Sequence, residues 1–176
     1  MWKLSSDYKA KRKKNNYVWL IREHYSFNDA IFSDTLEADD LIADRVNELG
    51  KDKCIIVSLD KDLRTIGGWL WSYQKIAEKD MNGNLCLNEF GYKNMIFKYD
   101  SVDYISDEEA SLFFWQQMLM GDSGDGIGGL KKVGIKTAEK ILKDSNNHFI
   151  KVAREYIQRN QKNDFWINHR LLKLGN

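Results

Sequence analysis

Apolar residues in the first third of the chain follow two spacings. Residues 17–24 fit a short helix, and residues 36–49 repeat apolar positions at helical intervals up to Gly50, where a C-terminal cap belongs. Residues 54–59 form a continuous apolar run ended by acids, which is typical of a central parallel strand covered on both faces. A strand is also predicted over residues 30–32. The pattern therefore predicts an alternation of helices and strands.

The middle of the chain carries the signals of a hairpin. Residues 63–66 predict one short helical turn, and residues 69–79 alternate enough to form a strand. An Asn-Gly pair at residues 82–83 marks a tight turn that leads into a second strand over residues 84–90. A further short strand is predicted over residues 95–99.

The last third of the chain is predicted to be helical. Apolar spacing, with acids in the first turn of the first helix, predicts helices over residues 107–120, 135–143, 149–157 and 164–174. Strands give way to helices near Ala110, so we place a boundary there. The expected domains are an α/β domain over residues 1–109 and an all-α domain over residues 110–176.

Length and composition describe a globular chain. The 176 residues are 43% hydrophobic, which is enough for a core. No apolar run approaches the roughly 20 residues of a membrane span and no secretory signal is visible, so we expect a cytoplasmic protein. Cys54 and Cys86 match neither a metal spacing nor a disulfide framework and are interpreted as reduced packing residues. The net charge of +1 does not exclude a polyanionic substrate, because basic residues are concentrated in one short segment.

Three groups of carboxylates stand at the ends of predicted elements. They are Glu37, Asp39 and Asp40 at a helix start, Asp60 and Asp62 just past a strand, and Asp122 and Asp125 in a glycine-rich turn. In an open parallel sheet, such loops converge beyond the carboxyl ends of the strands. Acids gathered there would repel one another unless divalent cations neutralised them, and an all-oxygen set selects magnesium or manganese over zinc. Each group alone also fits a plainer interpretation, as helix-start acids, a helix cap or turn formers, but their joint occurrence favours a metal site.

A glycine turn opens the helix that follows. Its residues are Lys131, Lys132, Val133, Gly134, Ile135, Lys136 and Thr137. A helix N-terminus of this kind presents backbone N–H groups that hold a DNA phosphate without reading sequence. Gly134 would permit close approach, and the lysines, including Lys140, predict binding that weakens steeply with salt. The alternative interpretation is a plain helix-turn-helix corner in an all-α packing.

Basic side chains crowd the segment of residues 7–16. Lys9 and Arg12 lie three residues apart and would share one face of a helix. Two cations on one face would stabilise a phosphate that carries extra negative charge in a transition state. The alternative interpretation is a solvated surface or a localisation-like tract.

Taken in order, these motifs resemble those of the 5′ nuclease superfamily, which includes flap endonucleases, phage 5′-3′ exonucleases and the 5′ nuclease domain of bacterial DNA polymerase I. The motifs are EADD at residues 37–40, SLDKD at residues 58–62, and GDSGDGIGG with its helix-hairpin-helix at residues 121–144. The segment DYKAKR at residues 7–12 resembles the family's YKxxR segment at the base of its helical arch. The resemblance covers residues 7–174.

The resemblance implies a fold, cofactors and residue roles. The fold is a PIN-like (Rossmann-like) α/β domain, with a mostly parallel sheet and helices on both faces, followed by an all-α helix-hairpin-helix region that binds DNA. The seven carboxylates become ligands of two Mg²⁺ or Mn²⁺ ions, and Lys9 and Arg12 become catalytic cations that position the scissile phosphate. Residues 131–137 become the grip on duplex DNA, where the family commonly also binds K⁺. The implied activity is two-metal hydrolysis of phosphodiesters near a 5′ end or flap, in DNA or in the RNA of a hybrid, during replication or repair.

The chain also departs from the family pattern. Relatives begin with two aspartate-bearing strands upstream of the YKxxR segment, so we expect an N-terminally shortened member. Gly126 and Gly128 stand where Asn and Pro are usual, and Lys132 stands where glycine is frequent. The alternative function is therefore a DNA-binding fragment, or one half of a split nuclease whose partner is a separate N-terminal segment. In both cases we expect a monomer that binds flap, nicked or 5′-ended duplex DNA and no membrane.

Overall fold

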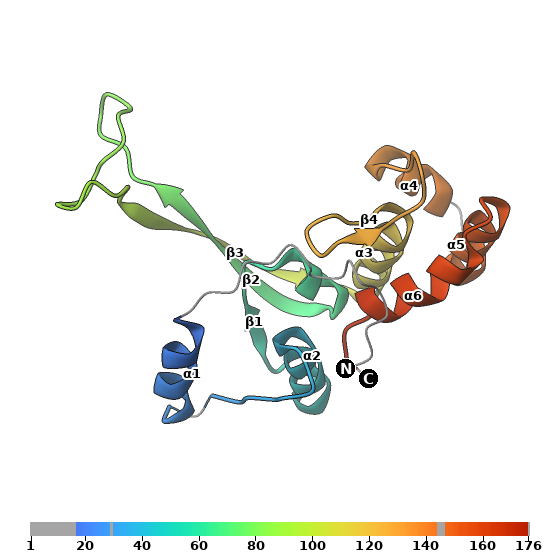
Figure 1. Cartoon of the computed structure of the whole chain (residues 1–176), viewed down its shortest axis with the longest axis horizontal. Coiled ribbons are helices and arrows are strands. Elements are labelled where there is room, and N and C mark those ends of the chain that lie inside the picture. Colours follow the sequence, from blue (N-terminus) through green and yellow to red (C-terminus); the bar gives the residue numbers. More distant parts are fainter. Residues whose placement is uncertain (1–16, 29, 144–146, 176) are drawn as a thin grey trace.

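Helices and strands alternate over the first part of the chain, and helices fill most of the rest (Figure 1). The computed structural model describes residues 17–28, 30–143 and 147–175. The first part contains α1 (Val18–Ser26), α2 (Ala38–Leu49), β1 (Ile55–Val57), the short 3-10 helix η1 (Lys61–Thr65), β2 (Gly68–Ala77) and β3 (Met95–Ile105). The second part contains α3 (Asp107–Met120), β4 (Gly121–Asp122), β5 (Ile127–Gly128), α4 (Ile135–Leu142), α5 (His148–Gln158) and α6 (Lys162–Leu172).

The main sheet has the strand order β1–β2–β3. β1 pairs parallel to β2, with Ile56 opposite Leu70, and β2 pairs antiparallel to β3 with a bulge between Trp71 and Tyr73. The α/β class is confirmed. Among the described strands the antiparallel pairing is the longer one, where a mostly parallel sheet was expected, because the chain returns from β2 through a hairpin rather than through a helical crossover.

The hairpin uses a different return strand from the one predicted. The tight turn at residues 82–83 is confirmed, but residues 84–90 form only isolated bridges. The partner of β2 is β3, which extends well beyond the predicted strand over residues 95–99. The strand predicted over residues 30–32 is wrong, because these residues lie outside any helix or strand. Whether a segment forms a strand depends on its pairing with a distant segment, and local alternation alone does not predict that pairing.

One face of the sheet packs on α2, η1 and α3. Its buried residues form a core of Ala43, Val46, Ile56, Leu63, Ile66, Leu70, Ile105 and Ala110. Neighbouring residues of a strand point to opposite faces, so Ile55 and Val57 point away from this core, and each is 55% exposed. The described elements thus cover one face of β1, whereas the continuous apolar run predicted that both faces would be covered.

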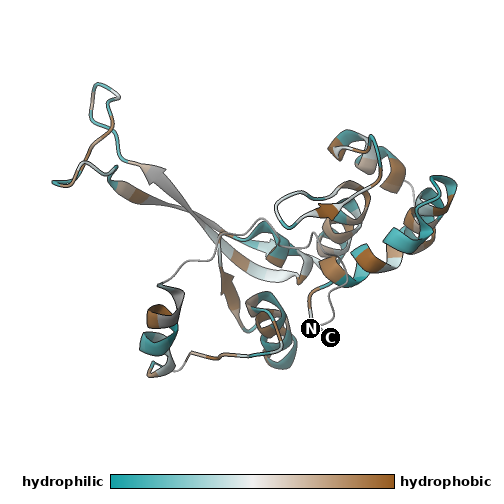
Figure 2. Ribbon diagram, viewed as in Figure 1, coloured by the Kyte–Doolittle hydropathy of each residue, from teal (hydrophilic) through white to brown (hydrophobic). Residues whose placement is uncertain are grey.

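A second core joins α3, α4, α5 and α6. Its buried residues are Met118, Leu119, Ile127, Leu130, Ala138, Leu142, Val152, Tyr156, Phe165 and Leu172. α3 contributes to both cores, since Ala110 belongs to the first and Met118 to the second, and its start is fixed by a capping box of Ser106 and Glu109. Apolar and polar bands alternate along α2, α5 and α6 in Figure 2, as expected for amphipathic helices. None of the described helices combines the length and the apolar character that crossing a bilayer requires.

Candidate metal and DNA-binding sites

A small acid-lined cavity lies where three segments distant in sequence meet. Its acids are Glu37 and Asp39 at the start of α2, Asp62 in η1, and Asp122 and Asp125 at the turn between β4 and β5. The remaining lining residues are Gln117, Ile127, Leu171, Leu172 and Leu174. The cavity has a volume of about 20 Å³, which is room for about one water molecule. The structure therefore brings together five of the seven predicted carboxylates.

Asp122 lies at the start of the β4–β5 turn, where two backbone segments approach each other closely. Asp122 is 7% exposed, and its Oδ1 accepts a hydrogen bond from the Gly124 N–H at 2.7 Å. β4 and β5 pair antiparallel at this point. A Cβ on Gly129 would lie 2.1 Å from the carbonyl carbon of Met120, so the two segments approach this closely only because residue 129 has no side chain.

A chain of buried hydrogen bonds from α5 and α6 stabilises the same turn. The Asn168 Nδ2 group donates to the Gly128 carbonyl at 2.6 Å and to the Tyr156 hydroxyl at 2.9 Å, and this hydroxyl donates to the Met118 carbonyl. Burial raises the pKa of Tyr156 to about 12, so the hydroxyl remains a neutral donor. Helices α5 and α6 thus fix the position of β5 relative to the end of α3.

η1 places Asp62 against α3. The Asp60 carboxylate accepts the N–H of Asp62 at 3.0 Å and so caps η1 directly after β1. Asp62 in turn accepts a hydrogen bond from Gln117 Nε2 at 2.5 Å. Burial raises the pKa of Asp62 above its ordinary value, against the opposing effects of the Lys61 charge and the Gln117 hydrogen bond.

Lys61 brings a positive charge to the acids. Its Nζ lies 2.8 Å from Asp122 Oδ2 and 3.7 Å from Asp62 Oδ1. The hydrogen bond to Asp122 raises the pKa of the Lys61 ammonium, although burial opposes it. Burial by itself would raise the pKa of Asp122, but hydrogen bonds from Lys61 and from the Gly124 N–H hold it below its usual value. Lys61 and Asp122 therefore both carry charge at neutral pH.

Two of the seven predicted carboxylates, Asp40 and Asp60, do not line the cavity. Asp40 accepts a hydrogen bond from the Gly175 N–H at 3.3 Å. Asp60 caps η1 and lines an open hollow next to β1. Lys9 and Arg12 lie outside the described residues, so their role stays a prediction.

The acid cluster suits a hard divalent cation by its chemistry. Its members are carboxylates, and oxygen ligands of this kind bind Mg²⁺ or Mn²⁺. Within the described residues, no three His, Cys, Asp or Glu side chains stand close enough to hold a metal ion together. The donors thus fit such an ion in type, and binding would require them to draw together around it.

Gln117 is a site residue that the sequence pattern did not single out. It lies on α3, is 3% exposed and contacts Asp62. A signal for it exists, because Gln117 follows Phe114 by three residues and Ala110 by seven and so shares their apolar face of the helix. A polar side chain on a buried helix face requires a partner or a function.

The predicted DNA-binding residues form an exposed turn that opens α4. Lys131, Lys132, Gly134, Ile135, Lys136 and Thr137 are exposed, and Val133 is half-buried. Gly134 is the N-cap of α4, and a Cβ there would meet no atom within 4 Å. Lys132 has a φ of 61°, in the left-handed region that glycine adopts at least cost. The start of α4 is therefore open to a phosphate group.

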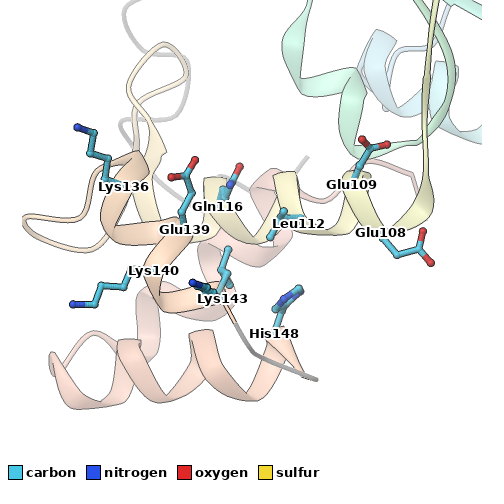
Figure 3. Close-up of a pocket in the computed structure, with 10 residues that line it drawn as sticks. Glu108, Glu109, Leu112, Gln116, Lys136, Glu139, Lys140, Lys143 and His148 are labelled. Carbon is cyan, nitrogen blue, oxygen red and sulfur yellow. The ribbon is translucent and has the colours of Figure 1, made fainter.

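A larger hollow of about 720 Å³ lies beside this turn, between α3 and the segment of α4 and α5 (Figure 3). Its charged lining residues have both signs and are Glu108, Glu109, Lys136, Glu139, Lys140 and Lys143. Figure 3 shows the side chains of Lys136 and Lys140 pointing away from Glu108 and His148. The two lysines therefore extend toward the outer side of α4, and the mixed charge makes the hollow itself a poor site for a metal or a polyanion.

Comparison with known proteins finds a sequence relative and a structural neighbour. No protein-family model matches the chain. A 5′-3′ exonuclease of Buchnera aphidicola subsp. Schizaphis graminum (strain Sg) is 30% identical over 114 residues, which are 64% of this chain. The match covers 34% of that protein, so the chain spans about a third of the length of this relative. The crystal structure of T5 D15 protein co-crystallised with metal ions matches with a TM-score of 0.61 and 16% identity, over 97% of this chain and 68% of that chain.

Sequence and fold point to the same family. The acidic motifs occur in the family's order, and they lie at the ends of elements in a fold shared with T5 D15 protein. The sequence similarity is to a 5′-3′ exonuclease. The chain thus resembles the 5′ nuclease superfamily in sequence and in fold.

Proposed function

We propose that the chain is a divalent-metal-dependent nuclease of the cytoplasm that hydrolyses phosphodiesters of DNA near 5′ ends, as a 5′-3′ exonuclease or flap endonuclease. The observation that carries the proposal is the cavity lined by carboxylates from three distant segments. The name of the sequence relative, a 5′-3′ exonuclease, supports the same activity. The RNA strand of an RNA–DNA hybrid is a second substrate of the same chemical class.

The acidic residues of the cavity would hold the metal. When bound, two Mg²⁺ or Mn²⁺ ions would supply Lewis-acid chemistry for the hydrolysis. The residues that would hold them are Glu37, Asp39, Asp62, Asp122 and Asp125. Lys61 and the Gly124 N–H keep Asp122 ionised, so this carboxylate is able to bind a cation without first losing a proton. Besides the drawing together of the donors, binding would require the Lys61 ammonium to move away from Asp122.

The start of α4 would hold the duplex at a distance from the acids. The N–H groups of the first turn of a helix and its dipole attract a phosphate, and Gly134 leaves space for one to approach. Lys131, Lys132 and Lys136 surround this position and are exposed. Binding of this kind follows the DNA backbone, so we propose a contact without sequence preference that weakens as salt rises. A K⁺ ion at the same turn is part of this proposal.

Gly134→Ala is expected to weaken binding to duplex DNA about tenfold, because the added methyl group would stand between the helix N–H groups and the phosphate. The backbone angles of Gly134, φ −109° and ψ −177°, are open to alanine, so folding stability should change by less than about 1 kcal/mol. The measurement is the Kd by fluorescence anisotropy in EDTA at fixed salt. Gly128→Ala is the matched control, since a Cβ there also meets nothing within 4 Å. Equal Kd values for the two variants would contradict a phosphate contact at α4.

Cleavage assays on the purified chain test the proposed activity. The substrates are flap, nicked and 5′-ended duplex DNA with a 3′ label, each in Mg²⁺ and in EDTA. We expect cleavage in Mg²⁺ only, with products that carry a 5′ phosphate. Glu89→Gln changes an exposed acid far from the cavity in sequence and should cleave as the wild type does. No Mg²⁺-dependent cleavage of any of the three substrates would contradict the proposal.

DNA binding without cleavage is the second candidate function. The observation that favours it is the ammonium of Lys61, which already neutralises part of the acid cluster through Asp122 and Asp62. Under this function the chain binds duplex DNA in low salt without turnover. Cleavage would then appear on addition of a separate polypeptide that carries the family's two aspartate-bearing strands. Cleavage by the chain alone would exclude this candidate.

A further inference from the structure

Half of the Gln117 side-chain amide lacks a hydrogen-bond partner among the residues that the structure describes. Gln117 is 3% exposed, and its Nε2 donates to Asp62 Oδ1. Its Oε1 is the buried side-chain oxygen or nitrogen atom that has no partner among the described residues. Buried polar atoms are almost always hydrogen-bonded, because leaving one unpaired costs its desolvation free energy. An unpaired oxygen at this position therefore requires an explanation.

The orientation of the amide is set by Asp62. Turning the group over would place Oε1 against the Asp62 carboxylate, and two acceptor oxygens do not form a hydrogen bond. A methionine of similar length would fill the same space on α3 with no unpaired atom. Packing alone thus gives no reason for a glutamine here, and the contact with Asp62 accounts for only its nitrogen.

The same side chain lines the acid-lined cavity. The cavity holds about one water molecule, and its other polar lining residues are carboxylates, which accept hydrogen bonds when ionised. A water molecule there would donate to Oε1 and would offer its own oxygen to a cation. The amide then bridges Asp62 on one side and the cavity water on the other.

We propose that Gln117 is a positioning residue for divalent-cation binding, with Nε2 holding Asp62 in place and Oε1 fixing a water molecule of the cavity. This inference rests on the proposed function, because it concerns the cation that this function requires. Side chains that orient metal ligands without touching the metal commonly change its affinity when they are replaced.

Gln117→Met tests the inference on the full chain with Mn²⁺ as the probe. The Kd for Mn²⁺ is measured by electron paramagnetic resonance of the free ion, together with the spectrum of the bound ion and the Tm without metal. We expect the Kd to rise about tenfold and the bound-ion spectrum to change, with a Tm equal to or above that of the wild type. Gln116→Met is the matched control, since Gln116 is the neighbouring glutamine of α3 and lines the other hollow. It should leave the Kd unchanged.

Gln117→Glu keeps the inference testable if the methionine variant does not fold. It places a second carboxylate beside Asp62, and we expect saturating Mn²⁺ to raise its Tm by more than it raises the Tm of the wild type. An equal rise, or a Gln117→Met Kd within twofold of the wild type, would overturn the role of Gln117 and leave the proposed nuclease function standing. Failure of the wild type to bind Mn²⁺ would overturn the metal site and, with it, both proposals.

Discussion

Asp122→Asn is expected to lower Mg²⁺-dependent cleavage of flap DNA by about a hundredfold or more. A metal acting as a Lewis acid contributes several kcal/mol to transition-state stabilisation, and about 1.4 kcal/mol corresponds to a factor of ten in rate. Asp122 is buried in the acid-lined cavity and is held ionised there. An asparagine keeps the oxygen that accepts the Gly124 N–H and removes the negative charge, so the turn should stay folded while metal binding is lost.

The rate is measured under single-turnover conditions, beside a urea titration that shows the variant is folded. Glu89→Gln again serves as the control for a change of one charge at an exposed acid. A rate for Asp122→Asn within tenfold of the wild type would remove Asp122 from the proposed metal site. If the variant fails to fold, the role of the Asp122 carboxylate is structural, through its ion pair with Lys61.

Gly129→Ala is expected to lower the free energy of unfolding by about 3 kcal/mol, because its Cβ would overlap backbone atoms. The Cβ would lie 2.1 Å from the Met120 carbonyl carbon and 2.4 Å from the Gly121 nitrogen. Backbone cannot move aside as a flexible side chain does. Separating the two segments would also break the hydrogen bond from the Leu130 N–H to the Leu119 carbonyl, at 2.8 Å.

Gly128→Ala, one residue away, isolates the effect of this overlap. A Cβ on Gly128 meets no atom within 4 Å, so its free energy of unfolding should stay within about 1 kcal/mol of the wild type. Both values come from urea unfolding followed by circular dichroism. If Gly129→Ala lowers the free energy of unfolding no more than Gly128→Ala does, the two backbone segments at the β4–β5 turn are able to move apart at little cost.

The helices were predictable because each carries its own signal. α3 was predicted over residues 107–120 and forms over Asp107–Met120, since its acids, its capping residue Ser106 and its apolar positions all lie within one short segment. The acids of the cavity were predictable for a similar reason, as each motif ends a local element. Five of them do meet at one place.

The contacts between distant segments were not predictable in the same way. The partner of β2 is β3 and not residues 84–90, because the two candidates differ in tertiary pairing and not in local alternation. Asp40 belongs to the same motif as Asp39, yet it contacts Gly175 near the end of the chain. The position of Lys61 between Asp62 and Asp122 likewise depends on how η1 packs beside the β4–β5 turn.

The amino-acid sequence by itself determined the helices, the exposed glycine turn before α4 and the order of the acidic motifs, because periodicity, capping and turn residues act over a few neighbouring positions. Only the tertiary structure decided which acids share a cavity, that Lys61 pairs with two of them and that Gln117 of α3 joins them. The contacts of Asp62 with Gln117 and of Asp122 with Lys61 join residues that lie 55 and 61 positions apart, and no local pattern encodes such distances.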